Sequence, residues 1–176
     1  MKINDTSIPG LVYITGIPVI TDKRGSFRTP FRSDVAPAFE RFVNKQWNIS
    51  WNKRGATRGI HAEPWDKYVH VVAGKAFAAI VDCSLGKTHG RVETFILDET
   101  NALFIPEGCG NSFQALEPTA YAYLTSKLWF PDVKYLAISL DDPELRIDWP
   151  IKGSERIISD KDRSLPTRHE IFGDRS

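Results

Sequence analysis

The sequence has only two cysteines, Cys83 and Cys109, in 176 residues. This pair forms neither a disulfide framework nor the spacing of a zinc site, so a reducing, cytoplasmic compartment is expected. No apolar run approaches the roughly 20 residues that a bilayer-spanning helix needs. The N-terminal residues also lack the apolar core of a signal peptide. We therefore expect a protein without a membrane partner.

An excess of one charge is also missing, because the formal net charge at pH 7 is +1. This balance gives no electrostatic reason to expect binding to nucleic acid or to a membrane surface. Aromatic side chains are plentiful instead, with ten phenylalanines and five tryptophans in a chain of single-domain length. They hint at an aromatic-lined cavity in one domain over residues 1–176.

Helical periodicity is scarce. In the first half of the chain, only the stretch that Ser33 and Asp34 introduce, with Phe39, Phe42 and Val43 on one face, predicts a helix. Short alternating segments separated by turn residues predict strands over 11–14, 17–20, 26–31, 46–51, 67–73, 75–83, 92–97, 102–106, 112–116, 121–125 and 135–140. The pattern indicates an all-β fold, a jelly-roll barrel with a few short peripheral helices and a polar C-terminal segment outside it.

The stretch Thr57–Lys67 carries an arginine, a histidine and a lysine just before the strand expected at 67–73. Side chains that alternate inward from neighbouring strands of a barrel share one cavity. His61 could then act as a general base with Lys67 beside it. The commoner alternative for a lone histidine is a structural or surface residue, and the local pattern leaves both open.

A second stretch, Ile105–Asn111, contains the Pro-x-Gly turn of metal-binding cupins, which are small β-barrels. Those cupins usually have a histidine where this chain has Asn111. They also have a His-x-His pair where this chain has His61, Ala62 and Glu63. Two imidazoles of a divalent site are missing, so we expect no metal.

Tyr121 and Tyr123 fall on one face of the strand expected at 121–125. Each could be a core residue, or a phenol directed into a polar cavity could serve as a general acid. The run Asp160–Arg163 near the C-terminus has the composition of a solvated loop.

Taken together and in this order along the chain, these segments resemble the dTDP-4-dehydrorhamnose 3,5-epimerase family. Its members are sugar-nucleotide epimerases of the cupin superfamily. The resemblance runs from Ile8 to about Pro166. The matching segments are Asp22–Gly25, Gln46–Asn48, Arg58–His61, Lys67, Ile105–Gly108, Tyr123, Asp141–Pro143, Ile147–Pro150 and Ser159–Asp162. The resemblance implies a cupin jelly roll that uses no metal or cofactor, usually as a homodimer.

The resemblance also implies catalytic roles. His61 matches the general base, Asp162 the carboxylate that orients this base, Tyr123 the general acid, and Lys67 the cation that stabilises an enolate. Asp162 must then fold back over the barrel. The implied substrate- or nucleotide-binding residues are Arg24, Phe27, Gln46, Asn48, Arg58, Asn111, Trp129 and Lys161.

We therefore expect an isomerase for a nucleotide-linked 4-keto-6-deoxy sugar, converting dTDP-4-dehydro-6-deoxyglucose to dTDP-4-dehydrorhamnose. The chain departs from many members at Asn111, Trp129 and Thr29, where histidine, tyrosine and glutamate are usual, and it has a shorter segment between His61 and Lys67. Three alternatives stay open. They are epimerisation at one carbon only, a GDP- or CDP-linked sugar, and a non-catalytic cupin that binds a sugar nucleotide.

Overall fold

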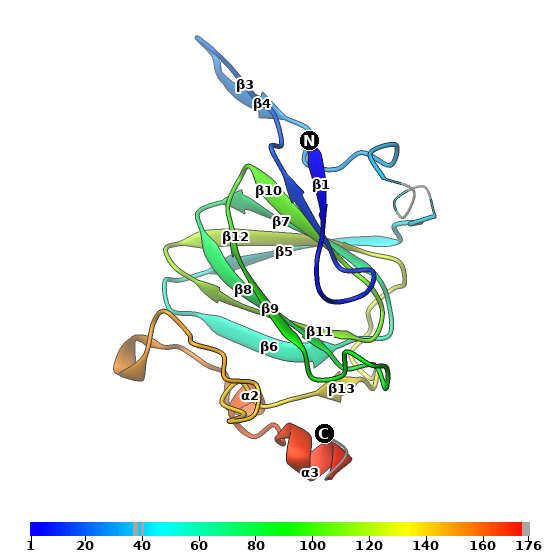
Figure 1. The fold of residues 1–176 in the computed structure, drawn as a ribbon. Coiled ribbons are helices and arrows are strands. Elements are labelled where there is room, and N and C mark those ends of the chain that lie inside the picture. The colour runs from blue at the N-terminus through cyan, green and yellow to red at the C-terminus, as the bar shows by residue number, and fades with distance from the viewer. Residues whose placement is uncertain (37–38, 40, 174–176) are drawn as a thin grey trace.

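Two antiparallel sheets face one another in the computed structural model, which describes residues 1–36, 39 and 41–173 (Figure 1). A separate two-stranded hairpin projects from one end, and short helical turns follow the last strand. The fold is mostly β, with two sheets and short helices, so the predicted fold class is confirmed.

The larger sheet has six strands, each paired antiparallel with its neighbours. In spatial order they are β1 (Lys2–Asp5), β2 (Val12–Thr15), β10 (Asn101–Ile105), β7 (Lys67–Ala73), β12 (Thr119–Thr125) and β5 (Gln46–Asn52). The short strand β1, at the edge, was not expected from the sequence.

The smaller sheet has five strands. In spatial order they are β13 (Leu136–Ala137), β6 (Thr57–Ala62), β11 (Cys109–Ala115), β8 (Ala76–Asp82) and β9 (Val92–Leu97). The hairpin consists of β3 (Val19–Asp22) and β4 (Gly25–Arg28). The helical turns are η1 (Gly153–Glu155), α2 (Asp160–Arg163) and α3 (Arg168–Phe172).

Alternation along the strands creates the core. Val69 and Val71 of β7 and Ala78 and Ile80 of β8 are buried between the two sheets. Their neighbours on β7 and β8 point to the outer faces, as the period of two in a strand requires. The space between the sheets therefore holds an aliphatic core. The part of this space that polar side chains line is the candidate site.

The C-terminal segment packs on the outer face of the smaller sheet. Ile60, Ala79 and Val81 meet Leu145 and Trp149 there in a buried cluster. This apolar contact places the chain after residue 140 below β6, where α2 lies (Figure 1).

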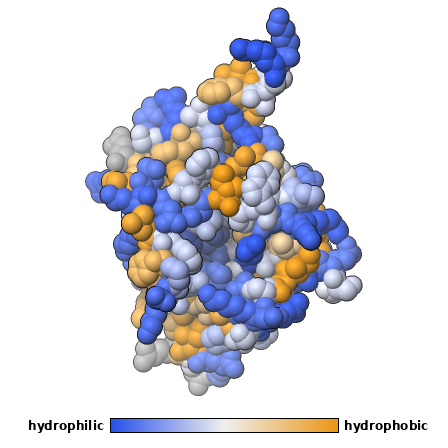
Figure 2. Space-filling model, turned by 180° about the vertical axis from the view of Figure 1, so that it is seen from behind, coloured by the Kyte–Doolittle hydropathy of each residue, from blue (hydrophilic) through white to orange (hydrophobic). Residues whose placement is uncertain are grey.

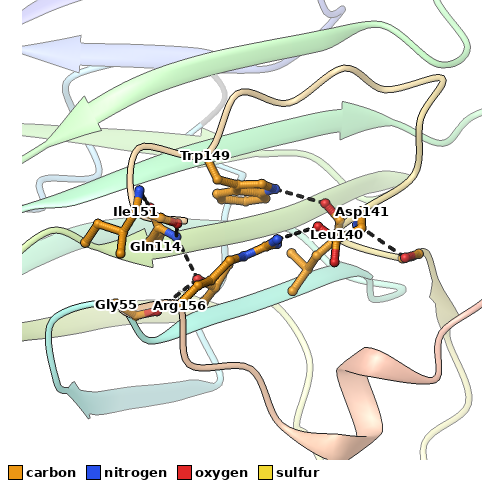
Figure 3. A network of polar contacts seen from close by, with 9 residues as sticks. Gly55, Gln114, Leu140, Asp141, Trp149, Ile151 and Arg156 are labelled. Carbon is orange, nitrogen blue, oxygen red and sulfur yellow. Dashed lines mark hydrogen bonds and ion pairs between the residues drawn. The ribbon is translucent and has the colours of Figure 1, made fainter. Parts of the chain in front are cut away.

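A polar network fastens the same segment (Figure 3). The fully buried Gln114 accepts a hydrogen bond from the Ile151 amide at 2.7 Å and donates one to the Ile151 carbonyl at 2.9 Å. The Trp149 indole donates to the Leu140 carbonyl, and the Arg156 guanidinium lies over the Trp149 ring. The donor and the acceptor of each of these buried hydrogen bonds are paired. Together the bonds fix the path of the chain from Leu140 toward α2.

The expected strand at 135–140 is shorter in the structure, because only Leu136 and Ala137 form β13. Backbone bonds between Ile60 and Ile138 extend the pairing by one position. The Ser139 amide then donates to the Pro166 carbonyl, so the chain leaves the sheet to meet the C-terminal segment. The helix expected after Ser33 covers residues 37, 38 and 40, which lie outside the described residues. Across the described ranges, no helix has the length and apolarity to cross a membrane.

Candidate active site

A pocket of about 150 Å³ lies between the sheets. Strands β6 and β11 of the smaller sheet line one side, and β5, β7 and β12 of the larger sheet line the other. The lining residues are Ser50, Arg58, Gly59, His61, Glu63, Lys67, Asn111, Phe113, Tyr121, Tyr123 and Asp162. All four residues with expected catalytic roles, His61, Lys67, Tyr123 and Asp162, are among them.

His61 and Asp162 are joined by a hydrogen bond of 2.9 Å between Nε2 and Oδ1. Asp162 reaches His61 because Ser159 caps α2, accepting a hydrogen bond from the Asp162 amide at 3.1 Å. Burial acts to raise the pKa of Asp162, but the hydrogen bonds from His61 and Ser159 hold it below its ordinary value. An ionised carboxylate can only accept a hydrogen bond, so in a neutral imidazole Nε2 is the donor to Asp162 and Nδ1 is the nitrogen with a lone pair. His61 is thereby arranged as a base.

Gly59 allows β6 to approach β11 closely. A Cβ at this position would lie 2.5 Å from the Cβ of Ser112 and 2.6 Å from the Asn111 carbonyl oxygen, and the backbone φ is +115°. A side chain is excluded both by the space and by the backbone conformation. The close approach places His61 opposite Asn111 in the strand register.

Asn111 and Tyr121 form a second polar contact in the pocket. The Tyr121 hydroxyl donates to Asn111 Oδ1 at 3.3 Å, and its ring stacks on Phe113 with centroids 3.8 Å apart. Tyr121 is fully buried and belongs to the core cluster between the sheets. Asn111 can therefore donate a hydrogen bond through its amide nitrogen, but it carries no charge.

Tyr123 lies on the opposite side of the pocket from His61. It belongs to β12, where it pairs with Asn48 and Val69 on the neighbouring strands. Burial, and then the carboxylate of Glu63, raise the pKa of Tyr123 above its ordinary value. The phenol is therefore protonated at neutral pH and can act as a proton donor.

Lys67 is the first residue of β7, and its side chain is only 3% exposed. Its ammonium forms an ion pair with Glu63, whose side chain is 12% exposed. Burial lowers the pKa of Lys67, and the attraction of the Glu63 carboxylate opposes that change. The pocket thus contains a buried, paired cation.

Two further cationic side chains lie at the rim of the pocket. Arg58 donates through Nε to Asn52 Oδ1 at 2.9 Å and is exposed to solvent. Lys161, also exposed, lies 3.4 Å from the hydroxyl of Tyr135, whose ring centroid is 5.4 Å from that of His61. Arg58 lines the pocket and Lys161 lies beside it, so this end of the pocket carries positive charge.

Gln46, Asn48 and Trp129 come together beside the pocket. Gln46 accepts a hydrogen bond from the Trp129 amide at 2.8 Å and donates one to Asn48 Oδ1 at 2.7 Å. Gln46, Asn48 and Ser50 share one face of β5, and Ser50 lines the pocket. The buried Nδ2 of Asn48 has no hydrogen-bond partner, which is unusual for a buried amide. A ligand in this row could satisfy it.

Arg24 and Phe27 lie elsewhere, on the projecting hairpin. The Arg24 side chain is 84% exposed and pairs with Asp22, and Phe27 is also exposed. Neither residue lines the pocket of its own chain. Two larger hollows, of about 410 and 450 Å³, lie beside the hairpin; among the described residues neither lining contains a histidine, and the one carboxylate in them, Asp22, is paired with Arg24.

Sequence reasoning missed four pocket or near-pocket residues, which are Ser50, Glu63, Phe113 and Tyr135. The sequence does indicate Glu63, because this residue lies two positions after His61 and four before Lys67. Among the described residues there is no group of three or more His, Cys, Asp or Glu side chains placed to hold a metal ion.

This geometry defines a pocket for acid–base chemistry on two faces of one ligand. His61 of the smaller sheet, hydrogen-bonded to Asp162 of α2, lies on one side, and the protonated phenol of Tyr123 and the buried ammonium of Lys67 lie on the larger sheet. Proton removal from one side and delivery from the other is the reaction type of an epimerase.

Comparison with known proteins agrees with that class. The family model for dTDP-4-dehydrorhamnose 3,5-epimerase matches residues 5–170. The chain therefore belongs to this family, and it is an epimerase, which is an isomerase.

Three individual matches support the assignment. The "Protein RmlC homolog" of Streptococcus pyogenes is 36% identical over 174 residues, which are 93% of this chain and 87% of the relative. A dTDP-4-dehydrorhamnose 3-epimerase of Streptomyces niveus is 36% identical over 160 residues, covering 85% of this chain and 76% of the relative. The structure of RmlC from Streptococcus suis in complex with dTDP-D-xylose has a TM-score of 0.86 and 32% identity, covering 94% of this chain and 90% of that one.

Proposed function

We propose that the chain epimerises dTDP-4-dehydro-6-deoxyglucose at C3 and C5, producing dTDP-4-dehydrorhamnose. The observation that most supports this proposal is the placement of His61 with Asp162 across one pocket from Tyr123 and Lys67. These groups provide a base, an acid and a cation on two sides of a sugar-sized space.

The 4-keto group acidifies the hydrogens on its neighbouring carbons. His61 removes one of them through Nδ1, and the electron pair of the broken C–H bond moves onto the ketone oxygen to give an enolate. Asp162 stabilises the imidazolium that forms, and Lys67 stabilises the enolate oxygen. Tyr123 returns a proton to the carbon from the other face, which inverts the centre.

The nucleotide lies outside the catalytic pocket in this proposal. Gln46 and Asn48 contact the base, and the unpaired Nδ2 of Asn48 is a donor that the ligand satisfies. Trp129 supplies an aromatic face for stacking. Arg58 and Lys161 neutralise the diphosphate at the rim, and Asn111 donates to the sugar.

The test is proton exchange in deuterated water with dTDP-4-dehydro-6-deoxyglucose, followed by NMR at each carbon. We expect deuterium at both C3 and C5. Folded protein that exchanges neither carbon, in this sugar or in its GDP- and CDP-linked counterparts, would show that the proposal is wrong and would leave a binding protein as the function.

A second candidate is epimerisation at one carbon only, and Asn111 is the observation that favours it. This neutral amide lies opposite His61 in the strand register, where many family members have a histidine. Relatives of similar identity include both 3,5- and 3-epimerases. Deuterium at C3 without deuterium at C5 would select this alternative.

We also propose a homodimer in which the hairpin of one copy reaches the nucleotide of the other. The hairpin stands away from the body, with charged side chains at its tip and apolar side chains below them (Figure 2). The exposed apolar residues of the hairpin and of the outer face of β5 are Val19, Ile20, Phe27, Trp47, Ile49 and Trp51. Contact with a second copy would cover this apolar surface and would give Arg24 and Phe27 a binding role that they lack in one chain.

A further inference from the structure

The ion pair between Glu63 and Lys67 forms across the turn that joins β6 to β7. Both side chains line the pocket, and both are almost entirely withdrawn from solvent. The other carboxylate lining the pocket, Asp162, is already hydrogen-bonded to His61. Within the described ranges, Glu63 is the carboxylate paired with the Lys67 ammonium.

We propose that Glu63 is a positioning residue that keeps Lys67 protonated and directed into the pocket, and that it thereby sets the alkaline limit of the reaction. This inference rests on the proposed function, in which the Lys67 ammonium stabilises the enolate. The pairing explains why a pocket that must stabilise a negatively charged enolate contains the carboxylate of Glu63.

The physical argument starts from the cost of burying an ammonium. A buried lysine without a partner loses its proton readily, because the charged form is poorly solvated. Lys67 is buried to that degree, and Glu63 supplies the compensating charge. Burial lowers the pKa of Lys67 and Glu63 opposes that change, so removing the carboxylate lowers the pKa further.

The remaining ionisable groups around Lys67 do not replace this charge. Facing it are Arg58 and His61 on β6, Cys109 on β11, Tyr121 and Tyr123 on β12, and Asp162 on α2. Burial raises the pKa values of Cys109, Tyr121 and Tyr123, so these three groups are neutral near pH 7. Arg58 is cationic and Asp162 is held by His61.

The same carboxylate also acts on the proposed acid. Burial is the larger cause that raises the pKa of Tyr123, and the negative charge of Glu63 adds to it. Glu63 thus favours the protonated forms of both donors on the larger sheet, the ammonium and the phenol. A neutral amide in its place favours neither.

The decisive experiment replaces Glu63 by Gln, which has nearly the same shape and no charge. The matched control is Glu107→Gln, which removes the carboxylate of an exposed ion pair. In that pair Lys127 Nζ lies 3.1 Å from Glu107 Oε2. A second variant, Glu63→Asp, keeps the charge on a shorter side chain. Thermal unfolding of each variant verifies that it is folded.

The first readout is direct titration of Lys67 by carbon-13 NMR of lysine-labelled, substrate-free protein, with its signal identified by its loss in Lys67→Arg. We expect the midpoint in Glu63→Gln to fall by about one pH unit or more, that in Glu63→Asp to fall less, and that in Glu107→Gln to stay at the wild-type value. An unchanged midpoint in Glu63→Gln would overturn the inference. This readout needs no substrate, so it stands even if the proposed substrate is wrong.

The second readout is the pH profile of kcat. In Glu63→Gln the alkaline limb should move to lower pH by a similar amount, with kcat recovering toward wild type below that limb and KM little changed. An equal loss of kcat at every pH would assign Glu63 a purely structural role and overturn the inference. Wild-type protein without any turnover would contradict the proposed function instead.

Discussion

Asp162 in the pocket and Asp22 in the hairpin each accept hydrogen bonds from a basic side chain, yet their surroundings differ sharply. The Asp162 side chain is 7% exposed and its partner His61 is 24% exposed, whereas Asp22 is 49% and Arg24 is 84% exposed. Surface ion pairs add little stability because water and salt screen them. A buried pair must be complete, because either member alone would leave a poorly solvated group.

The comparison separates two kinds of functional surface. The pocket is assembled within one chain, and the side chains with proposed catalytic roles come from β6, β7, β12 and α2. In the described part of the chain, the two hairpin strands pair only with each other, and Arg24 near the turn pairs only with Asp22. At the base of the hairpin, Arg28 contacts the body of the chain through an ion pair with Glu99. Substitutions in the pocket should therefore change the chemical step, while substitutions in the hairpin should change substrate binding.

The largest effect is expected for His61→Ala, because this variant removes the base itself. Exchange at both C3 and C5 should fall by about 10²–10⁴-fold, the usual contribution of a general base. The measurement is deuterium incorporation by NMR, with KM determined in parallel. His89→Ala, on the loop that follows β8, is the matched control and should retain the wild-type rate. Equal activity of His61→Ala and wild type would exclude His61 as the base.

Asp162→Asn should have the next largest effect. The amide leaves the shape of the site unchanged but loses the charge-assisted bond, which is worth about 1.5–3 kcal/mol. We expect kcat to fall by about 10- to 100-fold with little change in KM. Asp160→Asn, an exposed neighbour on the same helical turn, is the control. A rise in KM with unchanged kcat would mean that Asp162 contacts the substrate and does not orient His61.

The same variant links the pocket to acid stability. The folded-state pKa of Asp162 lies below its ordinary value, although burial acts in the other direction. A lowered carboxyl pKa stabilises the fold above the unfolded-state value of about 3.9, and this contribution disappears as pH falls through the folded-state value. Urea unfolding at several pH values should therefore show that wild type and Asp162→Asn differ near pH 7 and converge below about pH 4.

Strand alternation predicted the fold well where it had a clear physical cause. The predicted bounds of β7 and β9 coincide with the observed ones, because both segments are bounded by turn residues. The segment 135–140 alternates as well, yet its pairing with β6 ends after Ile138, because the Ser139 amide donates to the Pro166 carbonyl. Alternation describes one segment and contains no information about a distant partner.

The pocket shows the same limit. Asp162 lies 101 residues after His61 in a run with loop composition, so its contact with His61 was expected only from the family resemblance. Glu63 was visible in the sequence, but its pairing with Lys67 depends on how the turn after β6 folds. The exposed position of Arg24 was also hidden, because a Gly-containing turn does not reveal whether its hairpin packs on the body.

Arg24→Ala should have the smallest effect, and it tests whether the hairpin serves a second copy. Because Arg24 is exposed and pairs only with its neighbour Asp22, its loss should leave the unfolding free energy and kcat unchanged. Loss of one diphosphate contact should raise KM by roughly tenfold or less.

Mixed dimers decide whether Arg24 acts on its own pocket or on that of the partner. The Arg24→Ala protein is incubated with excess His61→Ala protein, and subunit exchange is followed by sedimentation of differently labelled chains. If Arg24 acts across the dimer, each pocket that retains His61 receives an intact Arg24 from the His61→Ala partner, and the low KM returns. If Arg24 acts within its own chain, those pockets still lack it and KM stays high, because exchange replaces only the neighbour. A restored KM would therefore make the hairpin part of the partner's binding site, and an unrestored one would return Arg24 to its own chain.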